Sequence, residues 1–117
     1  MSGPAGGVQI EDVGEDHGRA LRLAGELDMA GVPSLEAAMG RLWGEVSNLT
    51  LDLSGLSFID STGLAAIVHL SGLCAKHGCR LQIVPGPQAV QRLFELTGLD
   101  GVLPFAASPS RAERGAG

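Results

Sequence analysis

The sequence predicts a single α/β domain, in which helices pack against a mostly parallel, mixed β-sheet in the order β-β-α-β-α-β-α-β. Stretches that alternate apolar and polar residues, such as LTLDL at 49–53, are followed by stretches with apolar residues at helical spacing. Strands that alternate with helices in this way build parallel sheets. The length of 117 residues and the apolar content of 44% fit one domain with a real core.

The first half of the chain contains three predicted strands and one helix. Val8 and Ile10 indicate a short first strand, and residues 20–25, ALRLAG, alternate as a second strand should. Residues 32–43 begin with a Val-Pro pair and place apolar residues at helical spacing, which indicates a helix. The alternating residues 49–53 and the apolar pair 58–59 predict the third strand.

The second half adds two helices and two strands. We expect a helix over 62–77 that Gly78 closes, a strand over 80–84, and a helix over 87–99 with Gly98 at its left-handed cap. A last edge strand is predicted over 102–105, because Pro104 is tolerated only at an edge. The ordered core is expected at about 8–105, and residues 1–7 and 108–117 are expected to be flexible tails of this one domain, 1–117.

Charge and composition argue against several classes of partner. The net charge is −5 and the 8 basic residues are scattered, so there is no basic stripe for nucleic acid or an anionic membrane. Aromatic residues make up only 3%, too few for a surface that stacks bases. No apolar run is long enough to span a bilayer, and no secretory signal is visible. We therefore expect a cytoplasmic protein that binds neither nucleic acid nor membrane.

Neither the cysteines nor the acids predict a cofactor. Cys74 and Cys79 are expected to be reduced thiols that fill small apolar spaces. The three histidines do not pair with them at metal-ligand spacing. Asp28, Asp52 and Asp60 could gather at one end of the sheet as a metal site, but acids at such positions more often cap helices and turns. We expect no metal and no other cofactor.

The helix predicted over 62–77 has an unusual solvent face. One face is apolar and is expected to be buried: Leu64, Ile67, Val68, Leu70, Leu73 and Cys74. The opposite face is expected to meet solvent: Thr62, Ala65, His69, Gly72 and Lys76. Two of these residues have almost no side chain, although a glycine inside a helix costs about 1 kcal/mol relative to alanine. The small face either permits close approach of another protein or is covered by another element of this chain.

Residues 58–64, FIDSTGL, place an acid and two hydroxyls where a strand meets this helix. Asp60 or Ser61 is a natural N-cap, and capping alone would account for these residue types. Ser61 would also lie at the positive end of the helix, where a phosphate is well tolerated. A phosphate there adds about −1.5 to −2 charge beside Asp60 and would repel a partner docked over the helix start. The sequence thus leaves open a helix cap and a phosphorylation switch.

An enzymatic function is not favoured. The serine hydrolase elbow has the pattern G-x-S-x-G, and here Ile59 stands at the first glycine position. The chain also lacks a G-x-x-x-x-G-K-[ST] phosphate-binding loop, and residue order shows no nucleophile–base pair. We therefore expect a binding protein and not an enzyme.

Three stretches resemble the STAS domain family, and within it the anti-sigma factor antagonists. They are GELDMAGVPSLEAAM at 25–39, with the family's Gly-x-x-Asp, LTLDLSGLSFIDSTGLAAIV at 49–68, with its Asp-Ser-[Ser/Thr]-Gly signature, and RLFELTGL at 92–99. Together the resemblance covers about residues 8–105. After the signature Gly-Leu many members have glycine where this chain has Ala65.

The resemblance implies a partner-switching regulator. Such antagonists bind an anti-sigma factor that is also a serine kinase with an ATP-binding fold, and this binding frees a sigma factor. The kinase phosphorylates the serine after the signature acid, here Ser61, with Thr62 as a second, minor acceptor. A metal-dependent serine phosphatase reverses the modification. Together with the small solvent face of the helix, the resemblance leads us to expect these docking residues: Asp28, Asp60, Ser61, Thr62, Gly63, Ala65, His69 and Gly72.

A second interpretation uses the same fold in a different class of protein. STAS domains also occur as subunits of transport systems, such as lipid-trafficking or anion-transport complexes, where the domain binds an ATPase. That subunit would use the same helical face without a sigma factor. Neighbouring genes for a transporter would favour this interpretation, and genes for a kinase or phosphatase would favour the first.

Overall fold

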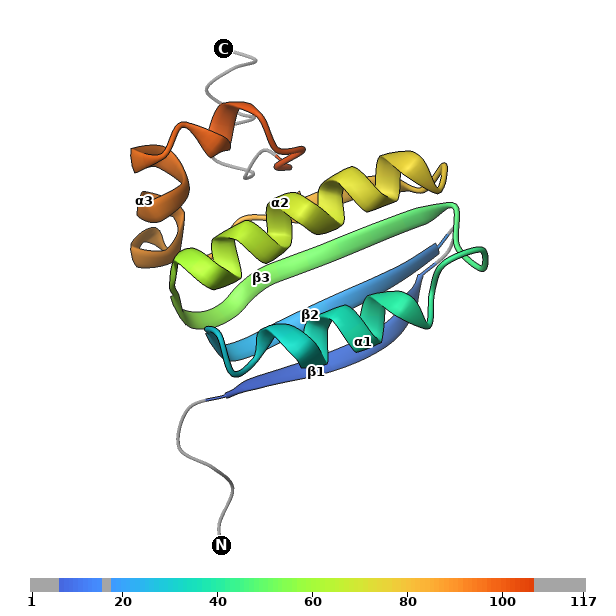
Figure 1. The fold of residues 1–117 in the computed structure, drawn as a ribbon, viewed down its shortest axis with the longest axis horizontal. Helices are drawn as coiled ribbons and strands as arrows, with labels where there is room; N and C mark the ends of the chain where they lie inside the picture. Colours follow the sequence, from blue (N-terminus) through green and yellow to red (C-terminus); the bar gives the residue numbers. More distant parts are fainter. Residues whose placement is uncertain (1–6, 16–17, 107–117) are drawn as a thin grey trace, which may run out of the picture.

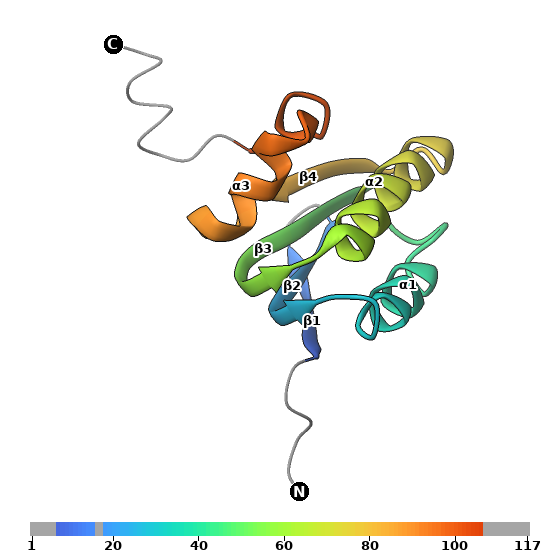
Figure 2. The same ribbon diagram turned by 60° about the vertical axis from the view of Figure 1, so that its left-hand side comes forward.

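The computed structural model describes residues 7–15 and 18–106, which form one sheet with helices packed against it (Figure 1). The elements are β1 (Val8–Glu15), β2 (Gly18–Leu27), α1 (Val32–Gly40), β3 (Asn48–Ile59), α2 (Ser61–Lys76), β4 (Arg80–Val84), α3 (Gln88–Leu96) and the 3₁₀ turn η1 (Leu99–Gly101). Helices α1 and α2 pack beside each other along the sheet, and α3 stands apart from both, beside the end of β3 (Figure 2).

The four strands form one mixed sheet in the order β1-β2-β3-β4. β1 and β2 pair antiparallel, whereas β3 runs parallel to both β2 and β4. The predicted mixed, mostly parallel sheet is therefore confirmed. Because parallel strands end at the same edge, the ends of β2 and β3 meet there, and Leu27 pairs with Ile59. The residues that follow these two strands are thereby brought together.

The core between sheet and helices is mainly aliphatic, as the composition predicts, and among the described residues Phe94 is its one fully buried aromatic side chain. The largest fully buried side chains are Phe94, Leu21, Leu23, Leu27, Leu35, Met39, Leu49, Leu51, Leu53, Leu56, Ile67 and Ile83. Burying each such side chain contributes about 1.5–3 kcal/mol, so the alternation of the strands and the apolar faces of the helices hold the layers together. Within the described ranges, no helix is both long and apolar enough to cross a membrane.

Two glycines end helices as predicted. Gly78 follows α2 with φ of +72°, and Gly98 follows α3 with φ of +77°. A residue with a Cβ is strained in this left-handed region. Each glycine therefore lets the chain leave its helix and turn back toward the sheet.

All three helices differ slightly from the prediction, and the helix predicted over 87–99 spans Gln88–Leu96. The helix predicted over 62–77 begins one residue earlier, at Ser61, and ends at Lys76. The helix predicted over 32–43 ends at Gly40, and turns follow it. The tails predicted at 1–7 and 108–117 lie outside the described residues, except for Gly7.

The edge strand predicted over 102–105 does not form. Residues 99–101 make the 3₁₀ turn, and the chain then reaches β4 only through an isolated bridge between Ile83 and Phe105. Pro104 has no N–H to donate, so only its carbonyl contributes, accepting from the Ile83 N–H at 2.9 Å. The Ala106 N–H completes the contact by donating to the Ile83 carbonyl at 2.7 Å.

Candidate functional site

The start of α2 is capped by Asp60. Its Oδ1 accepts hydrogen bonds from the backbone N–H of Gly63 at 2.9 Å and from the Thr62 hydroxyl at 2.6 Å. Of the two predicted caps, the acid therefore holds the helix, and Ser61 becomes the first helical residue. Ser61 is exposed, so another molecule can reach it.

The same contacts lower the pKa of Asp60. The Thr62 hydroxyl has the largest effect and the Gly63 N–H the next, because both stabilise the carboxylate more than the protonated acid. The carboxyl group is therefore ionised at neutral pH, beside the positive end of α2. Ser61 thus follows a fixed negative charge at the amide-rich start of a helix.

Gly63 is required by the close approach of α2 to the end of β2. The residue is buried, and a Cβ there would collide with the Leu27 carbonyl oxygen and crowd the Ile59 side chain. The Asp60 N–H also donates to the Leu27 carbonyl, at 3.3 Å. The signature glycine therefore allows the helix to begin against the neighbouring strand. Because Gly63 is buried, it supports the turn of Asp60 and Ser61 and does not itself face solvent.

Asp28 occupies the equivalent place after β2. Its Oδ1 accepts from the backbone N–H groups of Ala30 and Gly31, each at 3.1 Å, which orders the turn leading into α1. The Met29 N–H in this turn also contributes to the lowered pKa of Asp60. The two acidic turns therefore lie side by side, and backbone amides hold each carboxylate.

The solvent face of α2 is open. The residues predicted to be exposed are all exposed: Thr62, Ala65, His69, Gly72 and Lys76. A Cβ built at Gly72 would have no neighbour within 4 Å. No element among the described residues covers this position. For this part of the chain, the interpretation that the protein covers its own small helical face is therefore wrong.

Val68 corrects the predicted division of the helix. The sequence places it on the buried face, but its side chain is 38% exposed. Seven residues make almost two full helical turns, so Val68 lies on the same side as Ser61. The exposed face thus contains one large apolar side chain besides the small residues.

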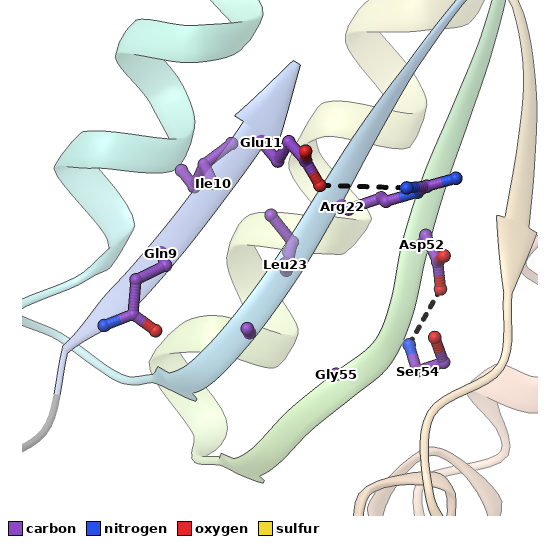
Figure 3. A pocket seen from close by; sticks show the side chains of 9 residues that line it. Gln9, Ile10, Glu11, Arg22, Leu23, Asp52, Ser54 and Gly55 are labelled. Atoms are coloured by element: carbon purple, nitrogen blue, oxygen red, sulfur yellow. Dashed lines mark hydrogen bonds and ion pairs between the residues drawn. The ribbon is translucent and has the colours of Figure 1, made fainter. Parts of the chain in front are cut away.

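A cleft of about 360 Å³ lies on the sheet face away from α1 and α2 (Figure 3). Its charged groups already have partners: Arg22 pairs with Glu11 at 3.7 Å, and Asp52 accepts the Ser54 N–H at 2.9 Å. The described residues contain no group of three or more His, Cys, Asp and Glu side chains placed to hold a metal ion. The three aspartates considered as a metal site therefore do not gather.

Sequence reasoning missed three exposed apolar side chains near the start of α2. Met29, Phe58 and Leu96 are 72%, 48% and 71% exposed. One signal could have found Phe58: neighbouring residues of a strand point to opposite faces, so only one residue of the Phe58–Ile59 pair could be buried on one face. Met29 and Leu96 lie in a turn and at a helix end, where periodicity is weakest.

The fold and the site together define a small STAS-type domain. Its mixed sheet ends in two adjacent acidic turns, and the Asp-Ser-Thr-Gly signature begins an open-faced helix. Residues 11–104 match the protein-family model described as "Mlab, STAS domain". This match spans nearly the whole described part of the chain.

Several similar proteins are named as antagonists of anti-sigma factors. The anti-sigma-B factor antagonist of Bacillus subtilis (strain 168) is 30% identical over 87 residues, which are 74% of this chain and 80% of that protein. An anti-sigma factor antagonist from Mycobacterium paratuberculosis has a crystal structure with a TM-score of 0.79 and 27% identity, and the match covers 98% of this chain and 97% of that one. The Bacillus cell fate determinant SpoIIAA in its phosphorylated form shares the fold, with a TM-score of 0.63 and 22% identity over 92% of this chain and 97% of its own. The chain belongs to the STAS domain family, among its anti-sigma factor antagonists.

Proposed function

We propose that this protein is a cytoplasmic anti-sigma factor antagonist controlled by phosphorylation of Ser61. The unphosphorylated form binds an anti-sigma factor that is a serine kinase with an ATP-binding fold, and this binding releases a sigma factor. Phosphorylation of Ser61 by that kinase ends the binding. A metal-dependent serine phosphatase restores the unmodified form. The antagonist acts by binding and not by catalysis.

The exposed position of Ser61 at the start of α2 is the observation that carries this proposal. Because Asp60 provides the cap, Ser61 is left outside the hydrogen bonds that begin the helix. A phosphate on Ser61 would lie at the amide-rich end of α2, where anions are stabilised. The modification would therefore change the surface without unfolding the domain.

The charge of the phosphate accounts for the loss of binding. It adds about −1.5 to −2 charge beside the ionised Asp60. A partner docked over this turn would have to remove water from both charges, and burying unpaired like charges is costly. Without the phosphate, the small residues Ala65 and Gly72 allow a close approach along α2.

Some of the other docking residues contact the partner directly, and one supports the turn that carries Asp60 and Ser61. We assign direct contact to Asp28, Thr62, Ala65, His69 and Gly72. Gly63 is buried and supports the turn that presents Asp60 and Ser61. Thr62 is the poorer phosphate acceptor, because its hydroxyl already donates to the Asp60 carboxylate at 2.6 Å.

Mapping of the phosphate tests the proposal. The purified protein is incubated with MgATP and, in turn, with each anti-sigma factor kinase encoded in its own genome, and then digested for mass spectrometry. We expect phosphate on Ser61, and in Ser61→Ala only a trace on Thr62. The proposal fails if none of these kinases modifies Ser61.

The second candidate is a STAS subunit of a transport complex. The family model that matches is described by Mlab and a STAS domain and mentions no sigma-factor regulator, so this match is compatible with either function. In a transport complex the α2 face would bind an ATPase subunit, and Ser61 would stay unmodified. Mass spectrometry of the complex isolated from native lysate separates the two: a transporter ATPase supports the alternative, and a serine kinase supports the antagonist.

A further inference from the structure

Exposed large apolar side chains lie in the turns at the start of α2 and along its exposed side. Five large apolar residues in the described ranges are exposed: Met29, Phe58, Val68, Leu96 and Val102. The first lies in the turn beside Asp60, the second near the end of β3, and the third on the Ser61 side of α2. Scattered exposed apolar residues need no explanation, but several at one place mark an interaction surface.

A groove of about 210 Å³ extends this surface to α3. It lies between the end of β3 and α3 and is lined by Phe58, Ile59, Leu93 and Leu96, together with smaller apolar residues and the polar Ser57 and Arg92. Both views show α3 beside the end of β3 (Figure 1, Figure 2). Ile59 is followed directly by Asp60 and Ser61. The groove therefore adjoins the proposed phosphorylation site.

We propose that this groove receives one large apolar side chain of the anti-sigma factor that docks at Ser61. The inference rests on the proposed function and adds a second, apolar point of contact on α3. A small molecule fits poorly, because sites for such ligands usually measure about 300–1,000 Å³. A second copy of this chain also fits poorly, since a stable interface buries about 800 Å² on each partner and only Phe58 and Leu96 are exposed large apolar residues here.

The apolar contact strengthens the effect of the phosphate. A leucine, methionine or phenylalanine seated in the groove excludes water from the neighbouring turn of Asp60 and Ser61. A phosphate on Ser61 then loses hydration without gaining a partner, which is costly for a charged group. One contact therefore contributes both to the affinity of the unmodified form and to its loss on phosphorylation.

Leu96→Glu and Val102→Glu form a matched pair that tests the groove. The two side chains are 71% and 75% exposed, but only Leu96 lines the groove. The Kd is measured by isothermal titration calorimetry with the purified anti-sigma factor that phosphorylates Ser61. We expect Leu96→Glu to weaken binding about 30-fold, the effect of losing an interface hot spot. Val102→Glu should change the Kd by less than about two-fold.

Leu96→Ala removes the side chain without adding charge and should weaken binding about ten-fold. Circular dichroism and thermal unfolding establish that each variant is folded. If Leu96→Glu and Leu96→Ala both bind like the wild type, the groove is not part of the interface, while Ser61→Asp would still weaken binding and leave the proposed function standing. If the wild type binds no anti-sigma factor of its own genome, the proposed function fails, and the groove proposal fails with it.

Discussion

The two ends of α2 differ in how they use their side chains. At the start, local hydrogen bonds hold Asp60, while Met29 and Phe58 are left exposed. At the end, Trp43 stacks on His77, with ring centroids 4.6 Å apart and planes inclined by 11°. The large ring of Trp43, which follows α1, therefore packs against the residue that follows α2. The aromatic side chains at the end of α2 therefore pack against each other, whereas the large apolar side chains near its start remain exposed to a partner.

The two cysteines lie at the end of α2, Cys74 in its last turns and Cys79 just after it. Cys74 and Cys79 are buried and free. Burial, with a smaller effect of Cys79, raises the pKa of the Cys74 thiol to about 12. A thiol with so high a pKa stays protonated at neutral pH and is a poor nucleophile. Both residues therefore act as the small apolar fillers that the sequence predicts.

Alanine substitutions at two glycines of α2 should give the largest difference in the free energy of unfolding between two positions of this helix. Gly63→Ala should lower the free energy of unfolding by about 3 kcal/mol, the upper range for overpacking, because its Cβ would collide with the Leu27 carbonyl oxygen. Gly72→Ala meets open space and should raise that free energy by up to about 1 kcal/mol. Urea unfolding followed by circular dichroism measures both. Equal effects would mean that α2 does not begin tightly against β2.

A negative charge added at the start of α2 should change the Kd for the anti-sigma factor, whereas one added at its end should not. Ser61→Asp should weaken binding to the anti-sigma factor about ten-fold, because a charge beside Asp60 must be dehydrated on docking. Ser61→Ala should bind like the wild type. Ala75→Asp puts the same charge on an exposed residue in the last turn of α2 and should leave the Kd unchanged. Isothermal titration calorimetry gives all three values, and equal weakening at both ends would refute a localised switch.

The sequence predicts α2 well because a helix has one regular period. The spacing of residues 62–77 correctly places Ala65, His69 and Gly72 on the exposed face. The glycine that closes the helix was also predictable, since it needs only local backbone geometry. At the start of the helix, the sequence offered two candidates for the N-cap, Asp60 and Ser61. Only the contacts in the structure assign that role to Asp60.

The sequence alone could not decide which residue of the Phe58–Ile59 pair is exposed, because β3 changes phase along its length. Relative to β2, two register shifts each add one residue to β3. The alternation that buries Leu53 therefore continues with Leu56 and Ile59 in the core and Phe58 outside. Such bulges depend on the partner strand, which the pattern of a single strand does not contain. The groove between β3 and α3 is likewise a product of tertiary packing.

Removing the cap should have a smaller effect than filling the space at Gly63. Asp60→Ala should lower the free energy of unfolding by about 1 kcal/mol, the usual loss for an N-cap. Asp60→Asn keeps an oxygen that can accept the Gly63 N–H and should change stability by only a few tenths of a kcal/mol. Urea unfolding at pH 7 compares the two variants. Equal losses would show that the charge of Asp60, and not its hydrogen bonds, holds the start of α2.

Of these changes, lowering the pH should have the smallest effect on the free energy of unfolding. It acts through the Asp60 carboxylate at the start of α2. The Thr62 hydroxyl and the Gly63 N–H lower the pKa of Asp60 in the folded protein, so the ionised carboxylate favours folding. This contribution is fully present above the unfolded-state pKa of about 3.9. It is lost as the pH falls through the lower folded-state value.

Thr62→Val isolates this contribution because it removes the largest cause of the lowered pKa. The difference in unfolding free energy between wild type and Thr62→Val should be constant above about pH 5 and shrink below about pH 4. Thr97→Val is the matched control: the Thr97 hydroxyl donates to the uncharged Leu93 carbonyl at 2.9 Å, so its difference should not follow the titration of Asp60. If the Thr62→Val difference stays flat to about pH 2, the Asp60 carboxylate is not what Thr62 stabilises.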